Sequence, residues 1–273
     1  MKIVSVGDIG IDEYINLGIK KPGGIAFNFA VNVIKNNIDC SLLSVIGKDQ
    51  EAKQLKNLLH SLNIDISHLQ EVNGKTAKQN IALKENGERK FVGYNAGVLS
   101  KWSLNKSDSK FILEHNAVFV PLSDGLEDIV HAIANLEGNI TKIIDFSQDY
   151  EFADFESEDN LIAKHCINFD IIFIGGNEKL TKRVKALSAK FSEKLFILTL
   201  GNQGSLAFKN DRSYFQKANK IKKIIDTTGC GDAFQAGFVT TYFNNKDIQQ
   251  ALKSGTKQAE SVITHIGSTE LNL

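Results

Sequence analysis

Short apolar, β-rich runs alternate along this chain with segments whose apolar residues recur at helical spacing, and this alternation limits the possible folds most. Buried strands are predicted at Lys2–Val6, Ser41–Ile46, Ala117–Pro121, Lys142–Phe146, Asp170–Ile174 and Leu195–Leu200. Helices are predicted at Ala26–Lys35, Gln50–Leu62, Asp124–Leu136 and Glu178–Lys190. Strands and helices in this order build βαβ units, so we expect an α/β fold of three layers, α/β/α, with a mostly parallel central sheet.

Two segments of the N-terminal third do not fit this alternation. Ile11–Leu17 is predicted to be extended directly after the first strand. Ala77–Tyr94 is predicted to be a hairpin around Asn86-Gly87, a pair suited to a tight turn with positive φ. We expect the two segments, at about residues 11–20 and 76–98, to form a small β lid over the main sheet.

Composition narrows the class of protein further. Lysine plus arginine and aspartate plus glutamate are both 32, and this absence of a basic excess argues against a nucleic-acid partner. Cys40, Cys166 and Cys230 form no CxxC pair, which favours a reducing compartment. No apolar run approaches the roughly 20 residues that span a bilayer, and the N-terminus has no signal-peptide pattern. We therefore expect a single cytoplasmic domain over residues 1–273, with no membrane contact.

The segment Asp226-Thr-Thr-Gly-Cys-Gly-Asp232 carries the strongest chemical signal. A helix predicted at residues 232–243 follows it, so Gly229 and Gly231 lie where a chain enters a helix. Glycines there allow a tight turn that directs backbone N–H groups at one point, and the helix dipole makes that point attractive to anions. Asp232 would repel an anion, unless it takes a proton from a hydroxyl beside a phosphate. The alternative is that Asp232 only caps the helix.

This segment resembles the C-terminal signature of the ribokinase-like (PfkB) carbohydrate kinases. Four further segments resemble motifs of that family in the same order, namely Val6–Asp12, Gly23–Ala30, Ile46–Asp49 and Leu198–Ser205. The resemblance implies a kinase with ATP and Mg²⁺ as cofactors and a small sugar as acceptor. It also implies a homodimer formed through the lid. A dinucleotide-binding oxidoreductase is disfavoured because no G-x-G-x-x-G follows the first strand.

The resemblance assigns roles to three sets of residues. At the transfer site Asp232 is the general base, and backbone N–H groups of Gly229, Cys230 and Gly231 form the anion hole. The expected acceptor-binding residues are Asp12, Gly23, Gly24 and Asn28. The expected nucleotide-binding residues are Thr199, Gly201 and Gly204, with helices at 247–252 and 255–265 beside the adenine. Read without the family, Asn28 would be a solvent-facing helix residue and Asp12 a charge at a strand edge.

Other positions concern metal ions and reactivity. The family commonly has an Asn-x-x-Glu motif that organises Mg²⁺, but Leu180 stands where its glutamate would fall, and Glu178 is a candidate substitute. Asp226 and Thr228 resemble positions that bind a monovalent cation such as K⁺ in some members. Cys230 replaces the usual alanine: it can pack as a small apolar residue, but a helix N-terminus would lower its pKa and make it reactive. In the second case we expect alkylation to inactivate the enzyme and ATP to slow it.

The acceptor is suggested by a finer resemblance to the fructoselysine 6-kinases of this family. Thr76–Gln79, Gly93–Val98 and Ile144–Ser147 carry it. The cationic amine of fructoselysine would suit carboxylates near the lid, for which Glu85, Glu88 and Asp124 are available. Arg89 would instead suit a sugar phosphate, so fructokinase-type and phosphofructokinase-type acceptors stay open, as does a sugar-binding protein without catalysis.

Overall fold

The computed structural model describes residues 1–146 and 167–273. Ser147 and Cys166, named above, lie outside the described residues. Within the described part, no helix is both long and apolar enough to cross a membrane.

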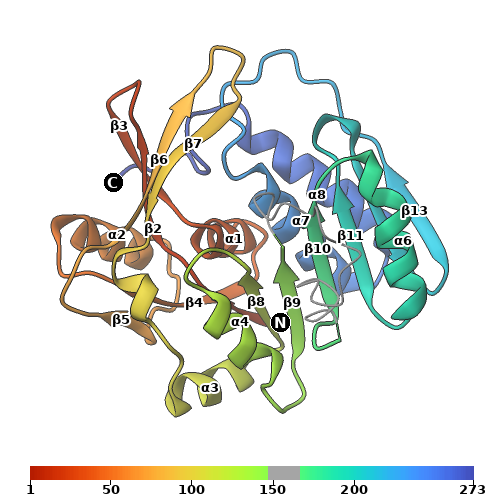
Figure 1. The fold of residues 1–273 in the computed structure, drawn as a ribbon, viewed down its shortest axis with the longest axis horizontal. Coiled ribbons are helices and arrows are strands. Elements are labelled where there is room, and N and C mark those ends of the chain that lie inside the picture. Colours follow the sequence, from red (N-terminus) through yellow and green to blue (C-terminus); the bar gives the residue numbers. More distant parts are fainter. Residues whose placement is uncertain (147–166) are drawn as a thin grey trace.

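The centre of the molecule is a nine-stranded sheet (Figure 1) with the order β13-β12-β11-β10-β9-β8-β1-β4-β5. The seven strands from β11 to β5 run parallel to one another, and β12 and β13 are antiparallel additions at one edge. The strands are β1 (Lys2–Val6), β4 (Asp39–Ile46), β5 (Leu69–Glu71), β8 (Ala117–Pro121), β9 (Thr141–Asp145), β10 (Ile171–Gly175), β11 (Leu195–Thr199), β12 (Ser205–Lys209) and β13 (Arg212–Gln216). The six predicted strands are confirmed.

Helices cover both faces of this sheet, which confirms the three-layer prediction. One face packs against α1 (Ile25–Ile34), α2 (Gln50–Ser61), α7 (Cys230–Asn245) and α8 (Ile248–Val262). The other face packs against η1 (Gly97–Lys101), α3 (Lys106–Leu113), α4 (Glu127–Ala134) and α6 (Thr181–Lys190), which directly follows η3 (Glu178–Leu180). Neighbouring residues of one strand point to opposite faces, so Ile3 packs with the first set and Val4 with the second.

The prediction of two C-terminal helices is wrong, because α8 is one helix that contains Gly255. A Cβ at Gly255 would lie 2.7 Å from the carbonyl oxygen of Phe234 on α7. This glycine lets two helices approach closely and does not mark a helix end.

The lid is a separate four-stranded sheet (Figure 1) with the order β3-β2-β6-β7. Its strands are β2 (Gly10–Tyr14), β3 (Ile19–Gly23), β6 (Ala77–Leu83) and β7 (Arg89–Asn95). Strands β6 and β7 form the predicted hairpin, and Gly87 in its turn has the expected positive φ of 81°. The first lid segment turns back on itself as β3, a strand that the sequence analysis did not predict.

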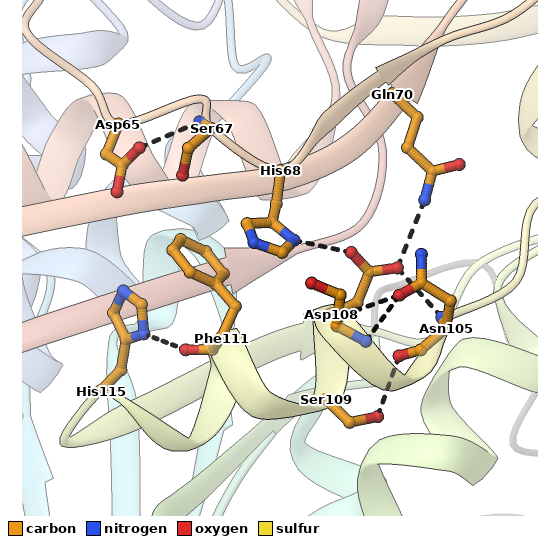
Figure 2. A network of polar contacts seen from close by, with 10 residues as sticks. Asp65, Ser67, His68, Gln70, Asn105, Asp108, Ser109, Phe111 and His115 are labelled. Carbon is orange, nitrogen blue, oxygen red and sulfur yellow. Dashed lines mark hydrogen bonds and ion pairs between the residues drawn. The ribbon is translucent and has the colours of Figure 1, made fainter.

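Helix α3, also absent from the prediction, is held by a polar network around Asp108 (Figure 2). Asn105 and Asp108 form a capping box at its N-terminus. The buried Asp108 carboxylate also accepts hydrogen bonds from His68 Nδ1 at 2.8 Å and Gln70 Nε2 at 3.3 Å. These contacts join α3 to the segment around β5, and none of these side chains lines the cavity described next.

Candidate active site

A cavity of about 1160 Å³ is lined by residues from both sheets and from the N-terminal end of α7. It brings together ten of the predicted site residues: Asp12, Gly24, Asn28, Thr199, Gly201, Gly204, Gly229, Cys230, Gly231 and Asp232. Gly23, the remaining one, does not line the cavity. Residues from the first 30 positions therefore line the same cavity as residues around position 230.

Asp232 lies in the first turn of α7, which begins two residues earlier than predicted. Gly229 precedes the helix with φ 78°, a left-handed conformation that favours glycine. The turn places the Asp232 carboxylate in the cavity with only 9% of the residue exposed. The carboxylate is therefore shielded from bulk water and held on a rigid element.

The surroundings of Asp232 suit a general base. Burial raises its pKa to about 7, the charges of Asp145 and Asp8 add to the rise, and a hydrogen bond from Asn28 opposes it. Asn28 Nδ2 donates to Asp232 Oδ2 at 2.7 Å, and Ser268 Oγ donates to Asn28 Oδ1 at 2.5 Å. A base is most effective when its pKa lies near the working pH, so a pKa of about 7 would suit this carboxylate to proton transfer near neutrality.

The anion hole differs in one detail from the prediction. Among the described residues, the N–H groups of Gly229, Gly231 and Asp232 have no hydrogen-bond acceptor, as expected at the start of a helix. The N–H of Cys230, however, points to the carbonyl oxygen of Thr227 at 3.4 Å. Cys230 therefore contributes less to the anion hole than the sequence suggested.

The expectation of a lowered thiol pKa at Cys230 is wrong. Burial raises the pKa of this thiol to about 12, and the charges of Asp232 and Asp226 act in the same direction. The sulfur faces the carbonyl oxygen of Ala259 at 3.8 Å. In this environment the side chain packs as a small apolar residue and the helix N-terminus does not activate it.

We therefore expect Cys230 in the folded protein to resist alkylation at pH 8. Since the thiolate is the reacting form, a pKa near 12 in place of about 8.5 lowers its population by roughly three orders of magnitude. Mass spectrometry of iodoacetamide-treated protein, with the urea-unfolded chain as control, measures this. Labelling of folded Cys230 at the rate of the unfolded chain would contradict the prediction.

The residues expected to bind the acceptor lie on the lid strands β2 and β3 and at the start of α1. Asp12 is buried on β2, and a Cβ at Gly23 would lie 2.3 Å from its Cγ, so Gly23 provides the space that the carboxylate occupies. Asp8, which the sequence analysis did not single out, accepts hydrogen bonds from the backbone N–H groups of Ile25 and Ala26. Asn28 is buried and bonded to Asp232, which excludes the solvent-facing alternative.

The Asp226 carboxylate has four hydrogen-bond donors around it. Oδ1 accepts from the backbone N and Oγ1 of Thr228, and Oδ2 accepts from Tyr14 Oη and the backbone N of Gly267. A carboxylate has about four lone-pair positions, so these donors use the hydrogen-bonding capacity of the side chain, and a monovalent cation at Asp226 and Thr228 stays a prediction. The role of the Asp226 side chain here is to join the lid strand β2 to the loop that precedes α7.

The residues expected to bind the nucleotide follow one another at the end of β11 and in the turn after it. Thr199 ends β11, and Gly201 opens the short helix η4 (Gly201–Gln203). A Cβ at Gly201 would meet no atom within 4 Å, whereas one at Gly204 would lie 2.1 Å from the carbonyl oxygen of Gln216. Gly201 thus leaves open space at the cavity and Gly204 is needed for backbone packing. Thr256 and Ala259 of α8, and Ile263 directly after this helix, also line the cavity.

Glu178 does not take the place of the missing glutamate. Its Oε1 accepts a hydrogen bond from Gln203 Nε2 at 2.9 Å, and neither Glu178 nor the buried Leu180 lines the cavity. Asp145, at the end of β9, does line it and is buried. The described residues contain no cluster of three or more metal-ligating side chains. One or two carboxylates together with substrate phosphates are, however, the usual way proteins hold Mg²⁺, so Asp145 fits that ion.

Several cavity residues were missed from the sequence, among them Asp8, Asp145, Phe91 and Tyr94. Asp8 and Asp145 follow or end parallel strands, where ligands of α/β sheets usually bind, and that position is the signal that could have identified them. Of the three carboxylates considered for a cationic acceptor, Asp124 lines the cavity, while Glu85 and Glu88 are exposed on the hairpin turn.

The fold and this site define an ATP-dependent kinase with a ribokinase-like architecture. The family model described as "pfkB family carbohydrate kinase" matches residues 18–132 and 156–273, and the chain belongs to this family. It is 28% identical to fructosamine kinase FrlD of Bacillus subtilis over 95% of this chain and 89% of that protein. It is also 28% identical to fructoselysine 6-kinase of Escherichia coli, over 97% of this chain and 98% of that enzyme.

Solved structures of other kinases have the same fold as this chain. The nucleoside kinase of Methanocaldococcus jannaschii superposes with a TM-score of 0.81 at 22% identity, covering 99% of this chain and 94% of that one. The ribokinase of Thermotoga maritima gives a TM-score of 0.72 at 20% identity, over 98% of this chain and 94% of that one.

Proposed function

We propose that this kinase transfers the γ-phosphate of ATP to a hydroxyl of an amine-substituted ketose, with fructoselysine as the favoured acceptor and fructoselysine 6-phosphate as its product. The observation that carries this proposal is the acidic and aromatic character of the acceptor end of the cavity. Asp8, Asp12 and Asp124 line it together with the rings of Phe91 and Tyr94 on the lid. Carboxylates attract a protonated amine and aromatic faces stabilise it further.

The same residues oppose a sugar phosphate as acceptor. The charges of Asp8 and Asp124, after burial itself, raise the pKa of the Tyr94 phenol, which supports a negative potential at this end. A phosphate dianion there would be repelled. Arg89, the cation considered for such a phosphate, lies against the loop before α7, where it bonds to Thr227 beside the transfer site and not beside Asp124. The 28% identity to the fructosamine and fructoselysine kinases favours the same acceptor class.

The proposed reaction follows from the placement of Asp232. Its carboxylate takes the proton of the acceptor hydroxyl as that oxygen attacks the γ-phosphorus, and the bond from phosphorus to the β,γ-bridging oxygen breaks to release ADP. Asn28 holds the carboxylate in place. The free N–H groups of Gly229 and Gly231 stabilise the charge on the phosphoryl oxygens, because fixed donors aimed at developing charge are an effective source of catalysis. Magnesium bound with ATP would be held through Asp145 and would neutralise phosphate charge.

The test is coupled ADP release with Mg-ATP and a panel of fructoselysine, fructose, ribose and fructose 6-phosphate. We expect turnover on fructoselysine. Asp124→Asn should raise KM for fructoselysine up to about fivefold, because Asp124 is exposed and an exposed charge pair contributes about 0.2–1 kcal/mol, and it should leave KM for fructose unchanged. Glu88→Gln is the matched control, since it removes the same charge from an exposed lid residue paired with Lys84.

Turnover confined to fructose 6-phosphate would overturn the acceptor and leave the kinase chemistry intact. Equal efficiency on fructose and fructoselysine would favour a fructokinase-type enzyme. Sugar binding by calorimetry without ADP formation from any of the four would favour a sugar-binding protein without catalysis.

A further inference from the structure

Arg89 ties the lid to the loop that forms the anion hole. It begins β7, and its Nη1 donates to the carbonyl oxygen of Thr227 at 2.9 Å and to its Oγ1 at 3.2 Å. In the same contact, the backbone N of Thr227 donates to the carbonyl oxygen of Gly87 in the hairpin turn at 3.1 Å. Two residues of the lid hairpin thus reach the segment that leads directly into Gly229.

The charge of Arg89 has no counter-ion within ion-pair distance in the described part of the chain. Among the described residues no carboxylate lies within 4.0 Å of its guanidinium, and its Nε is buried without a hydrogen-bond partner. The guanidinium lies 5.1 Å from the centroid of the Phe91 ring, which supports its apolar part only. A partly buried cation without a counter-ion costs free energy, because buried charges are normally paired with a charge of opposite sign.

Arg89 contacts Thr227, two residues before Gly229, and so lies beside the expected transfer site. It lines the same cavity as Gly229, Gly231 and Asp232. Its charge acts on groups from both sides: it lowers the pKa of Asp12 on the acceptor side and of Cys230 in the anion hole, each against a larger effect of burial. The guanidinium is therefore within electrostatic reach of the base, the acceptor carboxylate and the helix N-terminus.

We infer that Arg89 is a catalytic residue that the lid contributes, and that its guanidinium binds the phosphoryl group during transfer. The phosphoryl group carries negative charge on three equatorial oxygens in the transition state. The planar guanidinium presents several N–H donors in a fixed geometry, and Nη1 alone is engaged by Thr227. The unpartnered Nε and the missing counter-ion are then explained by an anion that is present only during the reaction.

This inference depends on the kinase class and not on the identity of the acceptor. The family glutamate that would organise the metal is replaced by Leu180, so the transfer site has one charged group fewer on its metal side. A cation delivered by the lid would stabilise phosphoryl charge from the opposite side. It would also make transfer conditional on a docked lid, because Arg89 and Thr227 come from the two parts that meet there.

The experiment compares Arg89→Met and Arg89→Lys with Lys90→Met, which removes the same charge from the neighbouring, exposed residue of β7. Binding of ADP alone and of ADP with aluminium fluoride, both with Mg²⁺, is measured by calorimetry beside kcat and KM. We expect Arg89→Met to lower kcat about 10²–10³-fold, as for loss of one transition-state donor. It should weaken ADP–aluminium fluoride by a comparable factor and leave ADP binding within about threefold of the native protein. Arg89→Lys should recover only part of the loss, because it keeps the charge but not the planar donor set.

Three results would overturn the inference. Equal weakening of ADP and ADP–aluminium fluoride would make Arg89 a nucleotide-binding or purely structural residue. A raised acceptor KM with unchanged kcat would make it an acceptor-binding residue. Should Arg89→Met fail to fold, Arg89→Lys decides, since native kcat and native aluminium fluoride affinity in that variant would exclude a bidentate contact. These readouts remain valid when fructoselysine is not the acceptor, because the two nucleotide titrations need no sugar.

Discussion

Asp232→Asn is expected to lose about 10²–10⁴-fold in kcat, the usual contribution of a general base, and to be more stable than the native protein at pH 8. The amide cannot accept the hydroxyl proton. Its oxygen can still accept the hydrogen bond from Asn28 Nδ2, so the local structure is kept. The gain in stability follows because the substitution removes a buried carboxylate that has no cation within ion-pair distance among the described residues.

The sign of the stability effect comes from the pKa. Burial raises the pKa of Asp232 from 3.8 to about 7, so the folded protein holds this proton more tightly than the unfolded chain. The contribution of the Asp232 carboxyl to the free energy of unfolding is therefore most favourable below pH 4, and it is lost as the pH rises toward 7. At about 1.36 kcal/mol per pKa unit the full cost is at most about 4 kcal/mol at pH 8.

Urea unfolding of both proteins at pH 5 and pH 8 measures this effect. We expect the stability difference to be larger at pH 8, with Glu88→Gln unchanged at both values. The native enzyme should also lose kcat/KM about tenfold per pH unit below pH 7, since the base must be ionised. Equal stability of Asp232→Asn and the native protein at pH 8, or a flat rate profile down to pH 5, would contradict the assignment of Asp232 as a tuned base.

Most of the fold could be predicted from the sequence because its strands are continuous apolar runs. Such runs are typical of strands in a parallel sheet that is buried on both faces. It also predicted the start of α7 to within two residues, where Gly229 has the left-handed conformation that favours glycine. It did not show that Asn28 holds Asp232, because the two residues are 204 positions apart and only the fold brings them together. It missed α3, a helix of eight residues whose stability depends on contacts with His68 and Gln70.

At Cys230, the residue type and its position at a helix N-terminus led to a wrong prediction of the thiol pKa. A helix N-terminus lowers a thiol pKa in general, yet here burial and two nearby carboxylates outweigh it. Glu178 is the second example: its position in the sequence made it a candidate metal-side residue, but Gln203 holds its side chain outside the cavity. Both outcomes depend on which neighbours the fold supplies.

Gly229→Ala and Gly231→Ala are both expected to lower kcat, but only Gly229→Ala should also destabilise the protein, although the two glycines are only two residues apart. Gly229 has φ 78°, and a Cβ there would lie 2.3 Å from the Cβ of Ser268. Alanine at this position is strained by about 1–2 kcal/mol and must also displace Ser268. Because Ser268 bonds to Asn28, and Asn28 to Asp232, the shift reaches the base. We expect Gly229→Ala to lose both stability and kcat, the latter about 10²-fold for a displacement near 1 Å.

Gly231 is helical, and a Cβ there would meet no atom within 4 Å. Alanine in a helix is favoured over glycine by about 0.5–1 kcal/mol, so Gly231→Ala should be as stable as the native protein or slightly more stable. Gly231 lines the cavity, however, and in the proposed mechanism the phosphoryl group passes through the space beside it on its way from ATP to the acceptor. We therefore expect this variant to fold normally and to lose kcat, with KM for the acceptor changed little.

Urea unfolding and steady-state kinetics on the two variants separate the effects. Full activity of Gly231→Ala would mean that phosphate does not approach this helix end, and normal stability of Gly229→Ala would mean that Ser268 can move without cost. Comparison of the two variants therefore tests whether the glycines at the start of α7 are required for the reaction or only for folding.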